Sequence, residues 1–305
     1  MILVVPLGIA WVAAVLLIPL NGRRIWVGRL SIAALAATFI ATLVLAVRVF
    51  SNGPIEMVAG GWPVGAGITL RADALGVLFT VVSLAVLLVA LIYEVLGGVH
   101  EGTLPALMLF LATGLTGLFL TGDVFNFYVF FEVSMTAAFV LSSYGRGQRQ
   151  IRATVIFTVV NLLGSTIFLG GVAALYRVTG TLEMRAVGAI VDVLEPRSTI
   201  VIAVTFLVAF SLKLGLFPFH FWLPPVYRDT WPSVAAVLAG ALANIGSYGL
   251  IRFGGDLMVR ELQFGAPVLL ALGAMSIIYG AHQAISVRSA REALAYSTIG
   301  QAGYI

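Results

Sequence analysis

Two ionisable side chains lie inside long apolar runs of this 305-residue sequence. Lys213, the only lysine, stands in FSLKLGLFPFHFWLPPVY at residues 210–227, and Glu132 stands in FNFYVFFEVSMTAAF at residues 125–139. At membrane depth a charge costs at least about 2.5–3.5 kcal/mol, so each requires a partner, a hydrated cavity or a function. Burial favours the neutral forms of a carboxyl group and an amine, whereas their mutual attraction favours the charged forms. We therefore expect Glu132 and Lys213 to transfer protons; a static ion pair between two helices is the alternative interpretation.

A proline five residues after Lys213 predicts a broken helix. Pro218 frees a backbone carbonyl one turn earlier, and such breaks are tolerated at depth only where protein or water satisfies the backbone. We therefore expect a hydrated cavity beside Lys213. His220 either passes protons between this break and the cytoplasm or is an interfacial anchor among neighbouring aromatic residues. Arg228 and Asp229, predicted in the loop that follows, either gate the mouth of the cavity or are ordinary solvated charges.

Further polar residues lie within apolar runs. His282 and Gln283 either extend a polar path or form a hydrogen bond that packs helices, and Asn244 either lines water or bridges helices. For Asn161 helix packing is the favoured interpretation. Asp123 stands at the N-cap position of the predicted helix that carries Glu132, and a capping role is favoured there.

The composition is that of a polytopic membrane protein. Hydrophobic residues make up 61% and charged residues 10%, against roughly 45–50% and about 25% in soluble domains. The absence of cysteine excludes disulfides and thiolate chemistry, and the sequence has no His/Cys metal motif and no nucleotide fingerprint. We therefore predict no metal and no cofactor. The net charge of +4 indicates arginines at lipid head groups rather than a nucleic-acid partner.

Apolar runs long enough to cross a bilayer recur along the whole length. They lie near 2–20, 30–50, 74–93, 104–121, 123–144, 153–176, 199–221, 232–251 and 265–286, and another begins near 292. Residues 51–73 predict an outside loop or hairpin, and residues 177–198 predict a short amphipathic segment. Positive charges follow the first run rather than precede it, which predicts a retained helix with the N-terminus outside, in a multi-pass protein of the cell (inner) membrane.

Several of these stretches together resemble one family, the antiporter-like subunits shared by respiratory complex I, membrane-bound hydrogenases and Mrp-type sodium/proton antiporters. FLTGDVFNFYVFFEV at 119–133 resembles the family's fifth helix with its glutamate at Glu132, and FSLKLGLFPFHFWLP at 210–224 resembles its seventh with the lysine at Lys213. AREALAYSTIGQAGY at 290–304 resembles the start of the tenth helix. The resemblance covers nearly the whole chain and favours the D-type subunits of Mrp antiporters.

The resemblance implies an all-α membrane fold of nine or ten spanning helices, built on inverted five-helix repeats. Residues 1–103 would form an N-terminal three-helix region, 104–251 the first half-channel repeat, and 265–305 the start of an incomplete second repeat. The chain is therefore expected to be a fragment of a longer protein; the alternative is that another polypeptide supplies the missing half. Asn244 stands where the family commonly has the lysine that accepts the proton from Lys213, which places the usual lateral route in doubt.

These observations predict a proton-conducting subunit of a cation (sodium)/proton antiporter, which is a secondary transporter and not an enzyme. Its expected partners are other membrane subunits, protons, sodium and the lipid bilayer. The alternative is a proton-translocating membrane subunit of complex I (NADH-quinone oxidoreductase) or of a membrane-bound hydrogenase. A third possibility is a non-conducting assembly subunit, because Asn244 cannot titrate.

Overall fold

The computed structural model describes residues 2–62, 67–145 and 147–305, and the chain forms two compact units. Unit 1 comprises Met1–Tyr144 and Trp231–Leu242, and unit 2 comprises Gly145–Thr230 and Ala243–Ile305. In the described part of the chain, seven helical segments are long and apolar enough to cross a membrane, and two apolar helices are shorter. The predicted all-α polytopic fold is thereby confirmed. The domain boundaries predicted at residues 103 and 251 are those of the five-helix repeat, whereas the two units are defined by how compactly the chain packs. These boundaries therefore stay a prediction.

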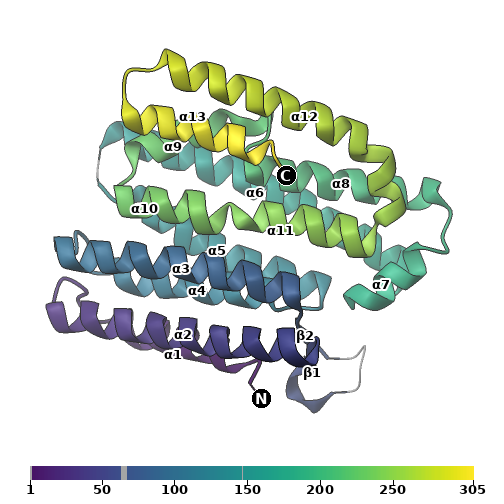
Figure 1. The fold of residues 1–305 in the computed structure, drawn as a ribbon, viewed down its shortest axis with the longest axis horizontal. Coiled ribbons are helices and arrows are strands. Elements are labelled where there is room, and N and C mark those ends of the chain that lie inside the picture. Colours follow the sequence, from purple (N-terminus) through teal and green to yellow (C-terminus); the bar gives the residue numbers. More distant parts are fainter. Residues whose placement is uncertain (1, 63–66, 146) are drawn as a thin grey trace. The chain divides into compact units, whose positions relative to one another are not determined.

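Unit 1 is built mainly from helices that pack side by side (Figure 1). Its elements are α1 (Val5–Leu17), α2 (Ile25–Asn52), β1 (Ile55–Val58), β2 (Thr69–Ala72), α3 (Ala74–Gly97), α4 (Leu104–Phe119), α5 (Val124–Ser143), α10 (Pro232–Val237) and a π-turn (Leu238–Leu242). The helix α4 lies at the centre of this packing, because it contacts α1, α3 and α5 and nearly all of its residues are buried. The helix α5, which carries Glu132, therefore packs on a buried framework within unit 1.

The predicted loop or hairpin at 51–73 contains two paired strands, and its residues 63–66 lie outside the described residues. Strands β1 and β2 pair antiparallel, with Ile55 opposite Ala72. The backbone N–H of Arg71 donates to the carbonyl of Leu120 at 2.8 Å, which fastens the hairpin to the turn between α4 and α5. The predicted hairpin is therefore confirmed, and it shares one end of unit 1 with that turn.

The opposite ends of these helices are also joined. The backbone N–H of Gly22, between α1 and α2, donates to the carbonyl of Gly102, between α3 and α4, at 2.7 Å. Connections within unit 1 thus alternate between two ends, as successive membrane crossings require. Which end faces the cytoplasm stays a prediction.

Unit 2 contains the interrupted helices. Its elements are α6 (Gln148–Thr179), α7 (Met184–Val191), α8 (Pro196–Leu214), a 3₁₀ turn η2 (Phe219–Trp222), α9 (Leu223–Asp229), α11 (Asn244–Arg252), a π-turn η4 (Phe253–Leu257), α12 (Val259–Ser286) and α13 (Ala290–Ala302). The amphipathic segment predicted within 177–198 is α7, which buries one face and is capped by the Glu183 side chain. The span predicted at 232–251 lies within one helical segment, Pro232–Leu257, that is long and apolar enough to cross a membrane, and a π-turn interrupts its α-helical geometry before Asn244.

The helices α8 and α11 approach closely because glycine lines their contact. A Cβ atom added at Gly246 would lie 2.5 Å from Cγ of Leu214, and one at Gly249 would lie 2.1 Å from the Phe210 ring. Only a residue without a side chain permits this approach. The packing fixes α11 against the end of α8 that carries Lys213.

Candidate functional site

Lys213 is buried at the end of a helix. It lies in the last turn of α8 and is 5% exposed. Among its contacts, its ammonium Nζ donates to Oδ1 of Asn161 on α6 at 3.3 Å. The partial negative charge at the C-terminus of a helix also favours a cation there. Asn161, which the sequence indicated as a packing residue, is therefore a polar partner of Lys213.

The predicted helix break is confirmed, but the helix ends earlier than the proline alone requires. Gly215 ends α8 in the left-handed conformation, with φ of 69°, three residues before Pro218. The freed carbonyl of Leu212 accepts the indole N–H of Trp222 at 3.1 Å, and the Trp222 ring stacks on Phe157 of α6. Protein groups thus satisfy part of the broken backbone.

A cavity of about 430 Å³ lies along α8 and reaches the break at Pro218. Its lining is almost entirely apolar, and its polar lining side chains are Ser211 and Glu261. The carboxylate of Glu261 accepts the hydroxyl of Thr199 at 2.5 Å. Because apolar cavities hold water poorly, this space differs from the hydrated cavity expected beside Lys213.

Glu132 lies in the middle of α5, in unit 1. Its side chain is half-buried, and its Oε1 atom is buried with no hydrogen-bond partner among the described residues. A buried carboxylate oxygen that lacks a donor is costly unless the group is protonated or paired. Because Glu132 and Lys213 belong to different units, their pairing stays a prediction.

His220 is buried just after the break. It is 9% exposed, and its Nδ1 atom has no hydrogen-bond partner in the described part of the chain. Its ring stacks on Phe217, with centroids 5.4 Å apart, and lies 4.2 Å from the ring of Tyr279 on α12. Both interpretations of His220, as a relay and as an interfacial anchor, stay predictions.

The two candidates further along the chain differ in exposure. His282 is exposed on α12, and Asn244 is half-buried at the first position of α11. π-turns within α-helices are frequent at functional sites, and Asn244 lies two residues after the π-turn Leu238–Leu242. The predicted polar path through these residues is untested.

The predicted cap of the glutamate helix is confirmed. The Asp123 carboxylate accepts the backbone N–H of Asn126 at 2.7 Å, which satisfies a donor that the first turn of α5 leaves free. Asp123 therefore positions the helix that carries Glu132.

The prediction that Arg228 and Asp229 lie in a loop is wrong, whereas a gating role for them stays a prediction. They form the last turn of α9, and the Arg228 guanidinium makes two hydrogen bonds to Asp229, at 2.8 and 2.9 Å. A third, at 3.1 Å, reaches Glu292 of α13. These contacts join the segment after the break to α13.

Sequence reasoning missed a buried carboxylate in unit 1, Glu94. Glu94 is 2% exposed and contacts His100 and Ser233. A glutamate in the last turn of an apolar run, six residues before a histidine, was the available signal. Arg252 was missed as well: it is 5% exposed and contacts Tyr248 and Asp256.

The comparisons with known proteins agree with the resemblance. Residues 121–305 match the family described as "NADH:quinone oxidoreductase/Mrp antiporter, TM". The putative antiporter subunit mnhD2 of Staphylococcus saprophyticus is 35% identical over 280 residues, which cover 90% of this chain and 56% of that protein. A chain of the Mrp complex from Dietzia sp. matches with a TM-score of 0.87 and 26% identity, over 99% of this chain and 56% of that chain. A chain of respiratory complex I from Thermus thermophilus matches with a TM-score of 0.84 and 26% identity, over 99% of this chain and 63% of that chain.

Apolar helices that enclose a buried amine at a helix break define a polytopic membrane protein with ionisable groups at depth. The family match covers more than half of the sequence. The chain belongs to the NADH:quinone oxidoreductase/Mrp antiporter transmembrane family. It spans between 56% and 63% of the length of the relatives described above.

Proposed function

We propose that this chain is a proton-conducting membrane subunit of a multisubunit cation/proton antiporter and that sodium is the coupled cation. Lys213 carries the proposal, because it is a buried amine in the last turn of an interrupted helix with a neutral amide among its partners. A lysine can release its proton when buried, whereas an arginine cannot. In this function Lys213 carries the proton and Glu132 tunes its charge.

The onward route runs from Lys213 past the break. His220 is buried directly after it, and Tyr279 and Asn244 offer polar groups on α12 and α11. Asn244 cannot titrate, so in this route it hydrogen-bonds to water or to a neighbouring polar group. His282 is the next group able to take up a proton. Residues 104–251 form the first half-channel in this proposal, and 265–305 begin the second.

The similarity to a putative antiporter subunit and to a chain of an Mrp complex supports this function and other membrane subunits as partners. Because the chain spans little more than half of those relatives, the activity of a whole protein is part of the proposal. The chain lies in the cell membrane with its N-terminus outside.

The second candidate function is a proton-translocating membrane subunit of a redox-driven complex. The match to a chain of respiratory complex I, with a TM-score of 0.84, favours it. In both functions Lys213 carries the proton. The driving force is a cation gradient in the first and a redox reaction in the second.

Reconstitution of the assembled complex in vesicles separates the two. We expect a sodium gradient alone to drive proton movement, followed with a pH-sensitive dye inside the vesicles. Proton movement that requires an electron donor and ignores sodium would favour the redox-driven complex instead. The absence of proton movement under both conditions would contradict both functions.

A further inference from the structure

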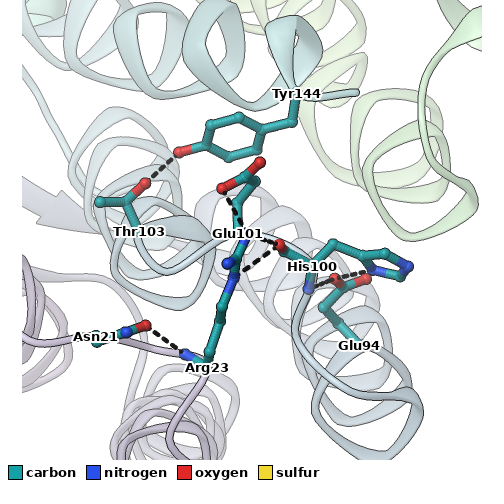
Figure 2. A network of polar contacts seen from close by, with 7 residues as sticks. All are labelled: Asn21, Arg23, Glu94, His100, Glu101, Thr103 and Tyr144. Atoms are coloured by element: carbon teal, nitrogen blue, oxygen red, sulfur yellow. Dashed lines mark hydrogen bonds and ion pairs between the residues drawn. The ribbon is translucent and has the colours of Figure 1, made fainter. Parts of the chain in front are cut away.

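A half-exposed histidine contacts a buried glutamate at the end of unit 1 that carries the turns after α1 and α3 (Figure 2). Glu94, in the last turn of α3, has a side chain that is 1% exposed, whereas the side chain of His100 is 54% exposed. Nδ1 of His100 lies 2.7 Å from Oε1 of Glu94, and the backbone N–H of His100 donates to the same oxygen at 3.2 Å. The second oxygen, Oε2, accepts the hydroxyl of Ser233 on α10 at 2.6 Å. Both oxygens of this buried carboxylate are thus occupied.

The groups around the pair hold His100 in place. The Arg23 guanidinium donates to the carbonyl of His100 at 3.0 and 2.7 Å and contacts the Glu101 carboxylate at 3.2 Å (Figure 2). The Trp231 ring packs 4.5 Å from the imidazole. The guanidinium and the Glu101 carboxylate neutralise each other, so the local charge depends on His100 and Glu94.

Tyr144 is a further titratable group of this network. Its hydroxyl is hydrogen-bonded to Thr103 (Figure 2). The centroid of its ring lies 6.0 Å from that of the Trp231 ring. Burial raises the pKa of Tyr144 above its usual value, and the Glu101 charge adds to this effect against the opposing hydrogen bond from Thr103. Tyr144 therefore stays neutral at physiological pH, and its only roles here are packing and hydrogen bonding.

A contact that only fastens a loop does not require ionisable groups, since a neutral amide makes the same hydrogen bonds without burying a charge. Imidazole gains and loses protons between about pH 5 and 8. A histidine that reaches water and touches a buried carboxylate therefore has the arrangement of a proton-uptake site. The Ser233 hydroxyl donates to the other oxygen of this carboxylate and so holds it toward His100.

We propose that His100 and Glu94 form a proton-uptake pair at this end of unit 1 and that Ser233 holds the Glu94 carboxylate in place. A hydronium ion protonates the imidazole at Nε2, and Nδ1 passes its proton to Oε1 of Glu94. The neutral carboxyl group then holds the proton at the buried end of the pair, with Oε2 still accepting the Ser233 hydroxyl, and the exposed ring returns to its starting tautomer by proton exchange with water. This proposal rests on the proposed proton conduction and adds a site on other helices than Lys213.

The test measures proton movement in vesicles that contain the assembled complex with His100→Asn or Glu94→Gln. Asparagine keeps a hydrogen-bond donor near Glu94, so a fastening role survives in His100→Asn, but it cannot relay a proton. We expect both variants to lose at least about tenfold in rate, as the removal of a proton-transfer group does elsewhere. Added imidazole buffer restores the His100→Asn rate in a concentration-dependent manner and leaves the Glu94→Gln rate low.

Tyr144→Phe is the matched control, because it removes a hydrogen bond from the same network without a group that titrates near neutral pH. Its rate should stay within about twofold of the wild type. Assembly is checked by co-purification of the other subunits. If Glu94→Gln does not assemble, the imidazole titration of His100→Asn decides alone.

A His100→Asn complex that moves protons at the wild-type rate, or one that is slow and ignores imidazole, would overturn this proposal. Either result would show that the His100–Glu94 contact only holds the loop after α3 in place. If the wild-type complex itself moves no protons, the proposed function fails first, so the two failures are distinguishable.

Discussion

The hydrogen bond between Asn161 and Lys213 makes a quantitative prediction for Asn161→Leu. Leucine has nearly the same volume but cannot accept a hydrogen bond from the ammonium. A hydrogen bond to a charged group contributes about 1.5–3 kcal/mol. Because the 3.3 Å distance is longer than usual and Lys213 has other contacts, the lower end of this range applies, near 1.5 kcal/mol. That energy corresponds to about a tenfold effect, since 1.4 kcal/mol equals a factor of about ten in an equilibrium constant.

We therefore expect Asn161→Leu to slow ion-driven proton movement about tenfold in vesicles that contain the assembled complex. The matched control is Thr166→Val. Thr166 lies on the same helix and its hydroxyl bonds the carbonyl four residues earlier, just as the Asn161 amide also bonds Phe157. This variant loses an intrahelical bond but no contact with Lys213. Wild-type rates in Asn161→Leu, or an equal loss in Thr166→Val, would refute the role assigned to Asn161.

Three further predictions concern the framework and its orientation. Gly114→Ala places a Cβ atom 2.7 Å from the backbone nitrogen of Ser134 and should destabilise the protein by about 1–3 kcal/mol, seen as a lower thermal midpoint of the purified complex. Gly170→Ala, which meets nothing within 4 Å, should leave the midpoint unchanged, and equal effects of the two changes would argue against the α4–α5 packing. Asp123→Ala should lower the free energy of unfolding by about 1 kcal/mol in the same assay, whereas Asp123→Asn keeps the cap and the stability. A loss of stability with asparagine but not with alanine would contradict the capping role. Because the chain has no cysteine, an introduced cysteine gives an unambiguous label. Val193→Cys should react with an impermeant thiol reagent from outside and Gly147→Cys only after permeabilisation, and the reverse pattern would invert the proposed orientation.

The sequence predicts the features that depend on local residues. The apolar runs, the cap at Asp123, the hairpin within 51–73 and the break near Pro218 all follow from composition and from proline, glycine and capping chemistry at known spacing. The break begins at Gly215 because glycine adopts the left-handed conformation without a Cβ clash.

The contacts between distant helices are not predictable in this way. Asn161 and Lys213 are 52 positions apart, and Glu94 and Ser233 are 139 positions apart. Apolar periodicity shows that a helix is buried but not which neighbour its polar residue meets. The partner of Lys213 and the Glu94–His100 pair therefore emerge only from the packed helices.

The most direct test of the central claim is the proton-transport rate of the assembled complex with Lys213→Arg. Arginine keeps the positive charge and the hydrogen bond to Asn161 but does not release a proton in a protein. If Lys213 carries the proton, Lys213→Arg assembles and loses ion-driven proton movement, as Lys213→Ala does. A Lys213→Arg complex that transports at the wild-type rate would show that this residue only holds a static charge and would contradict the account.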